Sequence, residues 1–317
     1  MLVKSNRRRW ALAGVATLAA VGAYVVPTAQ ASEADSSAKD KAPALAEVWR
    51  TDFDGGAGSL PSGDDWIIDK GHSYPGGAAN WGTGEIQEYT DSPDNVQLDG
   101  DGHLKITALK NGDTWTSSRI ETQRTDFAAP EGGVMRIQAG IKLPDVSGDA
   151  GLGYWPAFWT LGDKFRGNYQ NWPGIGEFDI LENVNGANTT YGTLHCGVSP
   201  GGPCNETTGK GNSQPCADTC KSDYHEYALE LDRSGATEEL RWYVDGEQFH
   251  SVKESDVDAQ TWADATGHGH FILLNLAMGG GFPDGVSGQT TPTAATEPGG
   301  SMSVDYVSVE STGGASK

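Results

Sequence analysis

Short segments in which apolar and polar residues alternate recur along the chain. Leu104, Ile106 and Ala108, for example, are separated by Lys105 and Thr107. Successive side chains of a strand point to opposite faces, so this period of two is typical of half-buried β-strands. Similar patterns predict strands within residues 134–143, 155–161, 190–197, 224–231, 241–244, 247–250, 271–278 and 302–310.

The connections between these segments favour antiparallel hairpins. Asp245-Gly246 separates two of them, and Asp-Gly is a preferred two-residue hairpin turn. Helical periodicity is confined to residues 255–265, where we expect one short helix. Many short strands without intervening helices predict an all-β fold, an antiparallel two-sheet sandwich. Such a sandwich can curve, and the residues on its concave face would then line a cleft.

Composition changes this picture in two ways. The chain of 317 residues contains 44 Gly, 10 Trp, 10 Tyr and 8 Phe, which predicts many turns and a core rich in aromatic side chains. Its formal net charge of -21 argues against binding to nucleic acid or to anionic membranes, because phosphate recognition needs clustered Lys and Arg. A neutral polar ligand suits this charge better.

The beginning of the chain has the order of a secretory signal peptide. Lys4 and Arg7-Arg8-Arg9 precede an apolar stretch at 11–26, and Ala29-Gln30-Ala31 follows it. We therefore expect a signal peptide at 1–31, a flexible leader at 32–44, one domain at 45–311 and a flexible tail at 312–317. A membrane anchor is the alternative, and Arg7-Arg8 leaves twin-arginine export open. The predicted location is extracellular.

All four cysteines lie within 25 residues, at Cys196, Cys204, Cys216 and Cys220. In an exported protein an even number of cysteines predicts disulfides. Three pairings exist, of which we favour Cys196–Cys204 with Cys216–Cys220. The alternative is a zinc site with four thiolates, which the irregular spacing and an oxidising compartment disfavour.

The segment 176–182 carries three carboxylates. Glu177 and Asp179 are two residues apart and share a face of a strand. A one-residue β-bulge around Ile180-Leu181 would bring Glu182 to the same face. Carboxylates so close raise one another's pKa, and a pair about 5–5.5 Å apart suits glycoside hydrolysis with retention. A solvated acidic edge strand has the same pattern, so the spacing alone leaves both interpretations open.

Trp155 and Trp159 precede this segment and share a face if 155–161 is a strand. Indole rings stack on the apolar faces of sugars, although core packing explains most buried Trp. Trp172 lies five residues before Glu177.

These residues resemble a known family. Trp155-Pro156-Ala157-Phe158-Trp159 together with Gly176-Glu177-Phe178-Asp179-Ile180-Leu181-Glu182 is similar to the glycoside hydrolases of family 16, and within it to the bacterial laminarinases, which are endo-1,3-β-glucanases. The segments 80–89, 116–120, 192–195 and 304–307 match further blocks of that family. The resemblance extends from roughly residue 47 to residue 310.

The resemblance implies a β-jelly-roll with a substrate cleft on its concave sheet. It also implies that Glu177 is the nucleophile, Glu182 the general acid/base, and Asp179 the assisting carboxylate between them. Further positions that would line sugar subsites are Trp155, Trp159, Asn80, Glu85, Arg119 and His195. For His195 the alternative is a buried structural histidine, and for Arg119 it is a structural ion pair.

One departure from the family pattern concerns the segments Thr83-Gly84-Glu85 and Gly280-Gly281-Phe282, where laminarinases often carry a second Asn and a Trp. Phe282 can still stack on sugar, but the linkage preference is left open. The resemblance also implies a structural Ca²⁺ held by Asp305 and by the opening segment 47–55, with a hydrogen-bonded structural Asp as the alternative. Asp99-Gly100-Asp101-Gly102 is better interpreted as a hairpin turn than as a calcium loop.

The sequence therefore predicts a secreted retaining endo-β-glucanase that cleaves 1,3-linkages of laminarin-like glucans. We expect no cofactor for the chemistry, a β-glucan as the only partner, no membrane or nucleic-acid binding, and a monomer. A mixed-linkage 1,3-1,4-β-glucanase is the alternative. A non-catalytic glucan-binding lectin on the same fold is a more distant one.

Overall fold

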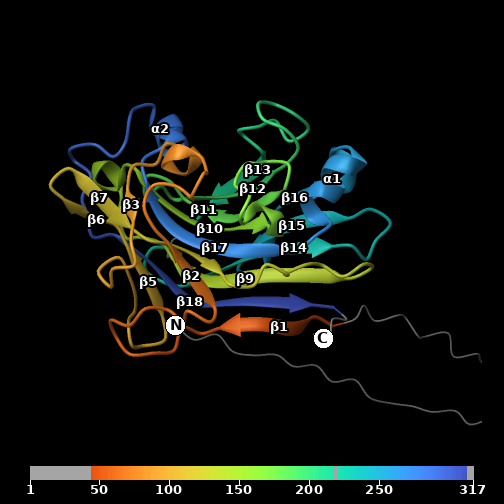
Figure 1. Ribbon diagram of the computed structural model, residues 1–317, viewed down its shortest axis with the longest axis horizontal. Helices are drawn as coiled ribbons and strands as arrows, with labels where there is room; N and C mark the ends of the chain where they lie inside the picture. Colours follow the sequence, from red (N-terminus) through yellow and green to blue (C-terminus); the bar gives the residue numbers. More distant parts are fainter. Residues whose placement is uncertain (1–43, 217–219, 313–317) are drawn as a thin grey trace, which may run out of the picture. The chain divides into compact units, whose positions relative to one another are not determined.

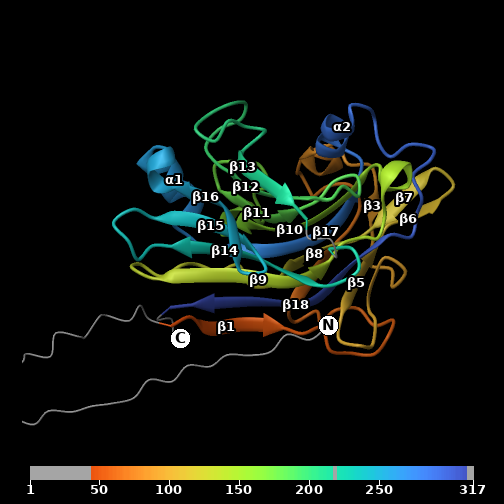
Figure 2. The same ribbon diagram turned by 180° about the vertical axis from the view of Figure 1, so that it is seen from behind.

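The structure is a computed structural model that describes residues 44–216 and 220–312. The expected signal peptide, nearly all of the expected leader, and residues 313–317 of the expected tail lie outside the described residues and stay predictions. Two large antiparallel sheets pack face to face in the described part, and their strands form two layers in Figures 1 and 2. This confirms the predicted all-β antiparallel sandwich.

One layer is an eight-stranded sheet whose strands pair in the following order. It runs β16 (Glu247–Lys253), β15 (Glu239–Val244), β14 (His225–Asp232), β9 (Val134–Lys142), β18 (Ser301–Ser311), β5 (Leu104–Thr107) and β4 (Val96–Leu98), with β1 (Ala46–Thr51) also paired to β18.

The other layer is a seven-stranded sheet with the carboxylate segment near its middle. Its order is β13 (Lys210–Pro215), β12 (Thr189–His195), β11 (Glu177–Glu182), β10 (Tyr154–Gly162), β17 (His270–Met278), β8 (Arg119–Thr122) and β2 (Trp66–Asp69). A small third sheet contains β3 (Glu88–Tyr89), β7 (Thr114–Ser117) and β6 (Leu109–Asn111).

The predicted hairpins are confirmed. Asp245 and Gly246 both have positive φ, 50° and 78°, as a type I′ turn between β15 and β16 requires. Residues 99–102 join the antiparallel strands β4 and β5, and the Asp99 carboxylate accepts the backbone N–H of Asp101 and of His103. The Asp99 carboxylate thus accepts backbone N–H groups of its own turn.

The helices differ from the prediction. Residues 254–256 form a 3-10 turn, and helix α1 (Ala259–Thr266) begins only after Asp258, whose carboxylate caps it by accepting the N–H of Thr261. A second helix, α2 (Gly281–Ser287), was not predicted, because its Gly and Pro content hides any helical period. Short 3-10 turns at Ala79–Gly82, Gly148–Gly151 and Asp163–Phe165 complete the set. Among the described residues no helix is long and apolar enough to cross a membrane.

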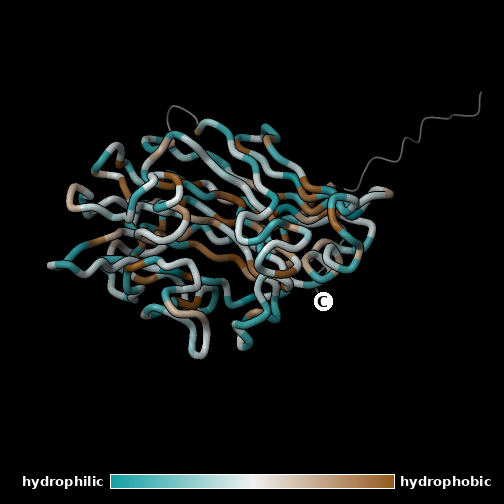
Figure 3. The backbone as a smooth tube through the Cα atoms, turned by 90° about the horizontal axis from the view of Figure 1, so that it is seen from above, coloured by the Kyte–Doolittle hydropathy of each residue, from teal (hydrophilic) through white to brown (hydrophobic). Residues whose placement is uncertain are grey.

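The core between the layers is rich in aromatic side chains, as expected from the composition. Apolar positions gather along the strands, while the peripheral loops are mostly hydrophilic (Figure 3). The largest fully buried side chains include Trp242, Tyr154, Tyr227, Phe158 and Phe178. The indole N–H of Trp242, on β15 of the eight-stranded sheet, donates to the backbone carbonyl of Asp179 over 2.7 Å. A buried residue of the eight-stranded sheet is therefore hydrogen-bonded to the main chain of β11 in the other sheet.

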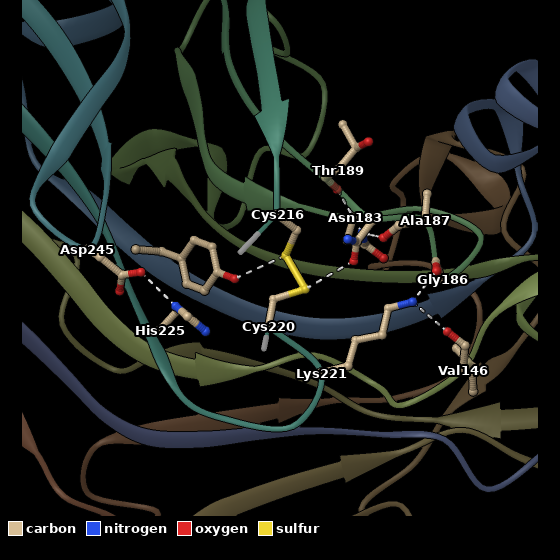
Figure 4. The surroundings of a disulfide bond; sticks show 12 residues. Val146, Asn183, Gly186, Ala187, Thr189, Cys216, Cys220, Lys221, His225 and Asp245 are labelled. Carbon is tan, nitrogen blue, oxygen red and sulfur yellow. Dashed lines mark hydrogen bonds and ion pairs between the residues drawn. A yellow bond between two sulfur atoms is a disulfide. The ribbon is translucent and has the colours of Figure 1, made fainter. Parts of the chain in front are cut away.

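Both favoured disulfides are confirmed: Cys196 is joined to Cys204 and Cys216 to Cys220. The second lies beside the turn that follows β11 (Figure 4), where the Asn183 side-chain amide donates to the carbonyls of Ala187 and Thr189.

Lys221, next to this disulfide, donates to the carbonyls of Val146 and Gly186. The turn that β11 leads into is thus tied to two other segments of the chain.

Candidate active site

Strand β11 presents one face to the core and the other to the outside of the seven-stranded sheet. Phe178, Ile180 and Leu181 are fully buried in the core, whereas Glu177 is half-buried. On β10 the same alternation buries Phe158 completely and leaves Trp155 and Trp159 half-buried. The outer face of this sheet therefore carries the carboxylates and the tryptophans together.

A β-bulge brings the third carboxylate to that face, as predicted. Asp179 pairs with Trp159 of β10 and Glu182 pairs with Ala157, so that two partner positions correspond to three steps along β11. The pairing of β11 with β12 shifts between the same residues. The extra residue keeps Ile180 and Leu181 both in the core and returns Glu182 to the outer face.

Glu177 and Asp179 form a tight group with His195 of β12. One possible ligand atom from each lies within 4.8 Å of the others, and His195 Nε2 is 3.3 Å from Asp179 Oδ2. Burial and the neighbouring Asp179 raise the pKa of Glu177 well above its usual range, while the charge of His195 acts in the opposite direction. The group is a set of coupled acids rather than isolated ones.

Glu182 is the third acid, with 8% of its surface exposed. Burial and the charge of Asp179 raise its pKa to about 8, although the hydrogen bond from the Trp155 indole lowers it. That indole Nε1 lies 2.9 Å from Glu182 Oε1. A carboxyl with this pKa retains its proton at neutral pH, as a general acid must.

His195 contacts a carboxylate with each ring nitrogen. Nε2 faces Asp179, and Nδ1 lies 2.7 Å from Glu206 Oε2. Burial alone would lower the pKa of His195, but the hydrogen bonds to Asp179 and Glu206 outweigh it and raise the pKa to about 11. The ring is therefore an imidazolium over the working pH range of most enzymes.

An aromatic cluster borders Glu182. The ring of Phe282, on α2, packs edge-on against Trp155 at 5.8 Å and against Tyr191 of β12 at 5.0 Å. Tyr191 is also the β12 partner of Glu182. The structure thus brings the predicted residues Trp155 and Phe282 to the same end of the carboxylate group.

Arg119, on β8 of the same sheet, lies among three aromatic rings. Its guanidinium carbon is 4.6 Å from the centre of the Trp81 ring, 4.8 Å from Trp159 and 5.1 Å from Tyr74. Nε donates to Asp69 over 3.0 Å, and only 5% of the residue is exposed. Arg119 thus forms a buried ion pair with Asp69 and packs against all three aromatic rings.

Glu85 is also buried, with 4% of its surface exposed. Burial raises its pKa to about 7 against the opposing effects of Arg119 and of its hydrogen bond to Tyr89. Tyr89 in turn accepts a hydrogen bond from Asn275, whose oxygen accepts the indole N–H of Trp159. A continuous polar chain therefore connects Glu85 to Trp159.

Asn80 is the one predicted site residue of this region that is exposed. It and Trp81 have φ values of 50° and 55°, a left-handed conformation that side chains seldom adopt. The turn projects Asn80 outward while Trp81 packs on Tyr74 and Arg119.

The described residues suggest two places for a cation. Glu177, Asp179 and His195 have suitable atoms, but each ring nitrogen of His195 already faces a carboxylate, Asp179 or Glu206. Asp305 is exposed on β18, and its carboxylate has no hydrogen bond or ion pair within the described part of the chain. Val304 pairs with Leu104, the first residue of β5, so Asp305 follows at the end of β5 that leaves the 99–102 hairpin. A Cβ on Gly102 of that hairpin would lie 4.0 Å from the Asp52 carbonyl and from the Asp54 carboxylate. These oxygen donors fit calcium chemistry.

Sequence reasoning missed several members of this site. Asn275 could have been found, because it is a polar residue within an otherwise apolar strand. Asp69, Tyr74 and Glu206 carry no local signal, because long-range folding alone brings them to the site.

Comparisons with known proteins agree with this geometry. Residues 141–250 match the family model described as the XgeA-like, catalytic GH16 domain. The beta-glucanase of Rhodothermus marinus is 30% identical over 293 residues, which cover 86% of this chain and 88% of that protein. The glucan endo-1,3-beta-glucosidase A1 of Niallia circulans is 29% identical over 285 residues, 83% of this chain but only 37% of that longer protein.

A solved structure is closer in sequence. The endo-1,3-beta-glucanase of Streptomyces sioyaensis shares 55% identity and superimposes with a TM-score of 0.83, covering 86% of this chain and 99% of that one.

Proposed function

Because this chain belongs to glycoside hydrolase family 16, we propose that it is a secreted endo-1,3-β-glucanase that hydrolyses laminarin-like glucans with retention of configuration. The observation that carries the proposal is the grouping of Glu177, Asp179 and Glu182 on one face beside Trp155 and Trp159. The faces of tryptophan rings bind sugar rings, and a pair of carboxyl groups can cleave the glycosidic bond between two sugars.

The proposed reaction is a double displacement. Glu182 donates its proton to the glycosidic oxygen while Glu177 attacks the anomeric carbon, so that the bond to the leaving sugar breaks and a glycosyl-enzyme forms. Glu182 then takes a proton from water, whose oxygen replaces Glu177 at that carbon. The raised pKa of Glu182 supports its role as the acid. Glu177 must be ionised to attack. Burial and Asp179 raise its pKa well above the usual range, and the neighbouring His195 is the cation that opposes them and favours the ionised form.

The relatives named above support the choice of a 1,3-linked glucan, and the uncharged polymer suits the acidic chain. The basic and apolar order of residues 4–31 supports secretion, and both disulfides suit an oxidising compartment. We further propose that the protein acts as a monomer without a membrane or nucleic-acid partner, and that a structural Ca²⁺ binds at Asp305.

The decisive experiment measures reducing-sugar release from laminarin by the protein and by its Glu177→Ala and Glu182→Ala variants. We expect a loss of at least about a thousandfold in each variant, because each removes an entire chemical role. Unchanged turnover in either variant would contradict the assignment. Proton NMR of the first products should show the β-anomer before mutarotation.

Comparison of the products from laminarin and lichenan separates the proposal from its alternatives. Cleavage of lichenan at rates equal to laminarin would indicate a mixed-linkage enzyme. Binding of laminarin without release of shorter chains would indicate a lectin.

A further inference from the structure

We propose that Glu206, two residues after the Cys196–Cys204 disulfide, is a positioning residue that holds His195 as an imidazolium against Asp179. The inference deepens the proposed function and rests on it. Glu206 contacts neither the expected nucleophile nor the expected acid; it acts through His195.

The position of Glu206 is fixed from three directions. Its Oε1 accepts the backbone N–H of Cys196 over 2.9 Å, and its Oε2 lies 2.7 Å from His195 Nδ1. The disulfide from Cys196 to Cys204 anchors the chain two residues before it. None of the Glu206 side chain is exposed. A buried carboxylate without such partners would be costly, so this one is built into the loop.

The His195 ring itself cannot turn freely. A Cβ placed on Gly209 would lie 2.9 Å from His195 Cε1, so the backbone of that glycine closes on one part of the ring. The Trp172 indole packs against it at 5.6 Å. The ring is therefore held with Nε2 toward Asp179, 3.3 Å away.

This geometry selects one protonation state. A neutral imidazole has a single N–H, so one ring nitrogen would present a lone pair to a carboxylate. Only the imidazolium donates to Asp179 and Glu206 at once. The raised pKa of His195 agrees with this conclusion.

The other charged groups near His195 are acids. Glu177 is its partner on β11, and Asp179 and Glu182 follow on the same strand. Lys210 of β13 pairs with the core residue Leu194, so it lies on the opposite face of the sheet. Within the described residues, His195 thus supplies the positive charge beside the acids, and Glu206 preserves it.

The consequence concerns the nucleophile. The His195 charge lowers the pKa of Glu177, which must be ionised to attack. Without the charge of Glu206, His195 loses one of the contacts that raise its pKa, so burial lowers that pKa against the remaining effect of Asp179 and Glu177. As the pH rises through that lowered pKa, His195 loses its charge, the already raised pKa of Glu177 rises further, and the reaction slows.

The test is the pH profile of kcat/KM on laminarin for Glu206→Gln, with the exposed Glu247→Gln as a control of equal charge change. We expect Glu206→Gln to remain within about threefold of the wild type at pH 5 and to fall at least tenfold further at pH 8. Glu206→Asp, which keeps the charge, should largely restore the profile. A uniform loss at every pH, or none, would overturn the inference.

A second measurement needs no substrate. The ¹⁵N resonances of the His195 imidazole, assigned with His195→Gln, should not titrate between pH 5 and 9 in the wild type and should titrate in Glu206→Gln. If wild-type His195 titrates below pH 8, the inference is wrong even when Glu206→Gln fails to fold. If the protein does not cleave laminarin, the proposed function fails while this titration still tests Glu206.

Discussion

Trp155 donates its indole N–H to Oε1 of Glu182 over a distance of 2.9 Å. One residue that we expect to bind sugar is thus bonded to the expected acid. The contact stabilises the ionised carboxylate and lowers its pKa against the effect of burial.

Trp155→Phe should shift the alkaline limb of the kcat/KM profile to higher pH. Removal of the indole donor leaves the charged form of Glu182 less stable, so its pKa rises further above 8 and the proton is retained to higher pH. We also expect a loss of about three- to tenfold at the optimum. Trp49→Phe is the control, since Trp49 lies on β1 of the eight-stranded sheet and its indole donates to Asp65 rather than to a site carboxyl. An alkaline limb that moves to lower pH would contradict this assignment.

Glu182→Gln should be more stable than the wild type at pH 8 and no more stable at pH 4. The pKa of Glu182 is about 8 when folded and near 4.5 in its ordinary state, so the unfolded chain releases this proton first as the pH rises. The wild type therefore loses stability between these values, and the neutral amide does not. Urea unfolding should show a gain of order 1 kcal/mol or more at pH 8. Glu247→Gln, which changes an exposed acid, should show no such dependence.

Arg119→Met should destabilise the protein by about 3 kcal/mol or more at pH 8, because it leaves the buried Asp69 without its cation. The loss should shrink toward pH 5. Burial already raises the pKa of Asp69 to about 7, and removal of Arg119 raises it further, so a protonated Asp69 then escapes the penalty at low pH.

The matched control for Arg119 is Lys70→Met. Lys70 pairs with Asp91 at the surface, with 63% and 52% of the two side chains exposed, and such pairs contribute about 0–1 kcal/mol. Equal losses in both variants would show that the buried pair has no special weight.

Calcium should raise the melting temperature of the wild type and not that of Asp305→Ala. An ion present at a hundred times its dissociation constant adds about 2.7 kcal/mol of stability, which corresponds to several degrees. Asp101→Ala tests whether the hairpin at 99–102 binds the ion instead. The melting temperature of each protein is measured by calorimetry with EDTA and with added Ca²⁺. A response lost in Asp101→Ala and kept in Asp305→Ala would place the ion in that hairpin.

The features that could be predicted from the sequence are those that depend on residues close together in the chain. The spacing of Glu177, Asp179 and Glu182, with two apolar residues before the last, requires a bulge if all three share a face, and the structure has it. The hairpin at Asp245-Gly246 and the strand periods were predictable for the same reason.

Other features depend on distant partners. The helix α2 has little intrinsic helical tendency, and the Asn185 side chain supports it by donating to the Pro283 carbonyl. Asp69 meets Arg119 from fifty residues away, and Glu206 reaches His195 through a loop whose path the disulfide fixes. Contacts between residues so far apart in the sequence leave no local pattern from which they could be predicted.

The expected nucleophile and acid belong to one strand that is hydrogen-bonded on both sides, to β10 and to β12. The spacing of their Cα atoms is therefore fixed by the main chain of that strand and does not depend on a hinge between loops or domains. Under the proposed function, the strand would hold both carboxyls in place before the glucan binds. Under the proposed function, adaptation would therefore fall on the polymer: a glucan that can bend one linkage to both carboxyls should be cut, and a stiff chain that cannot bend to them should remain uncut.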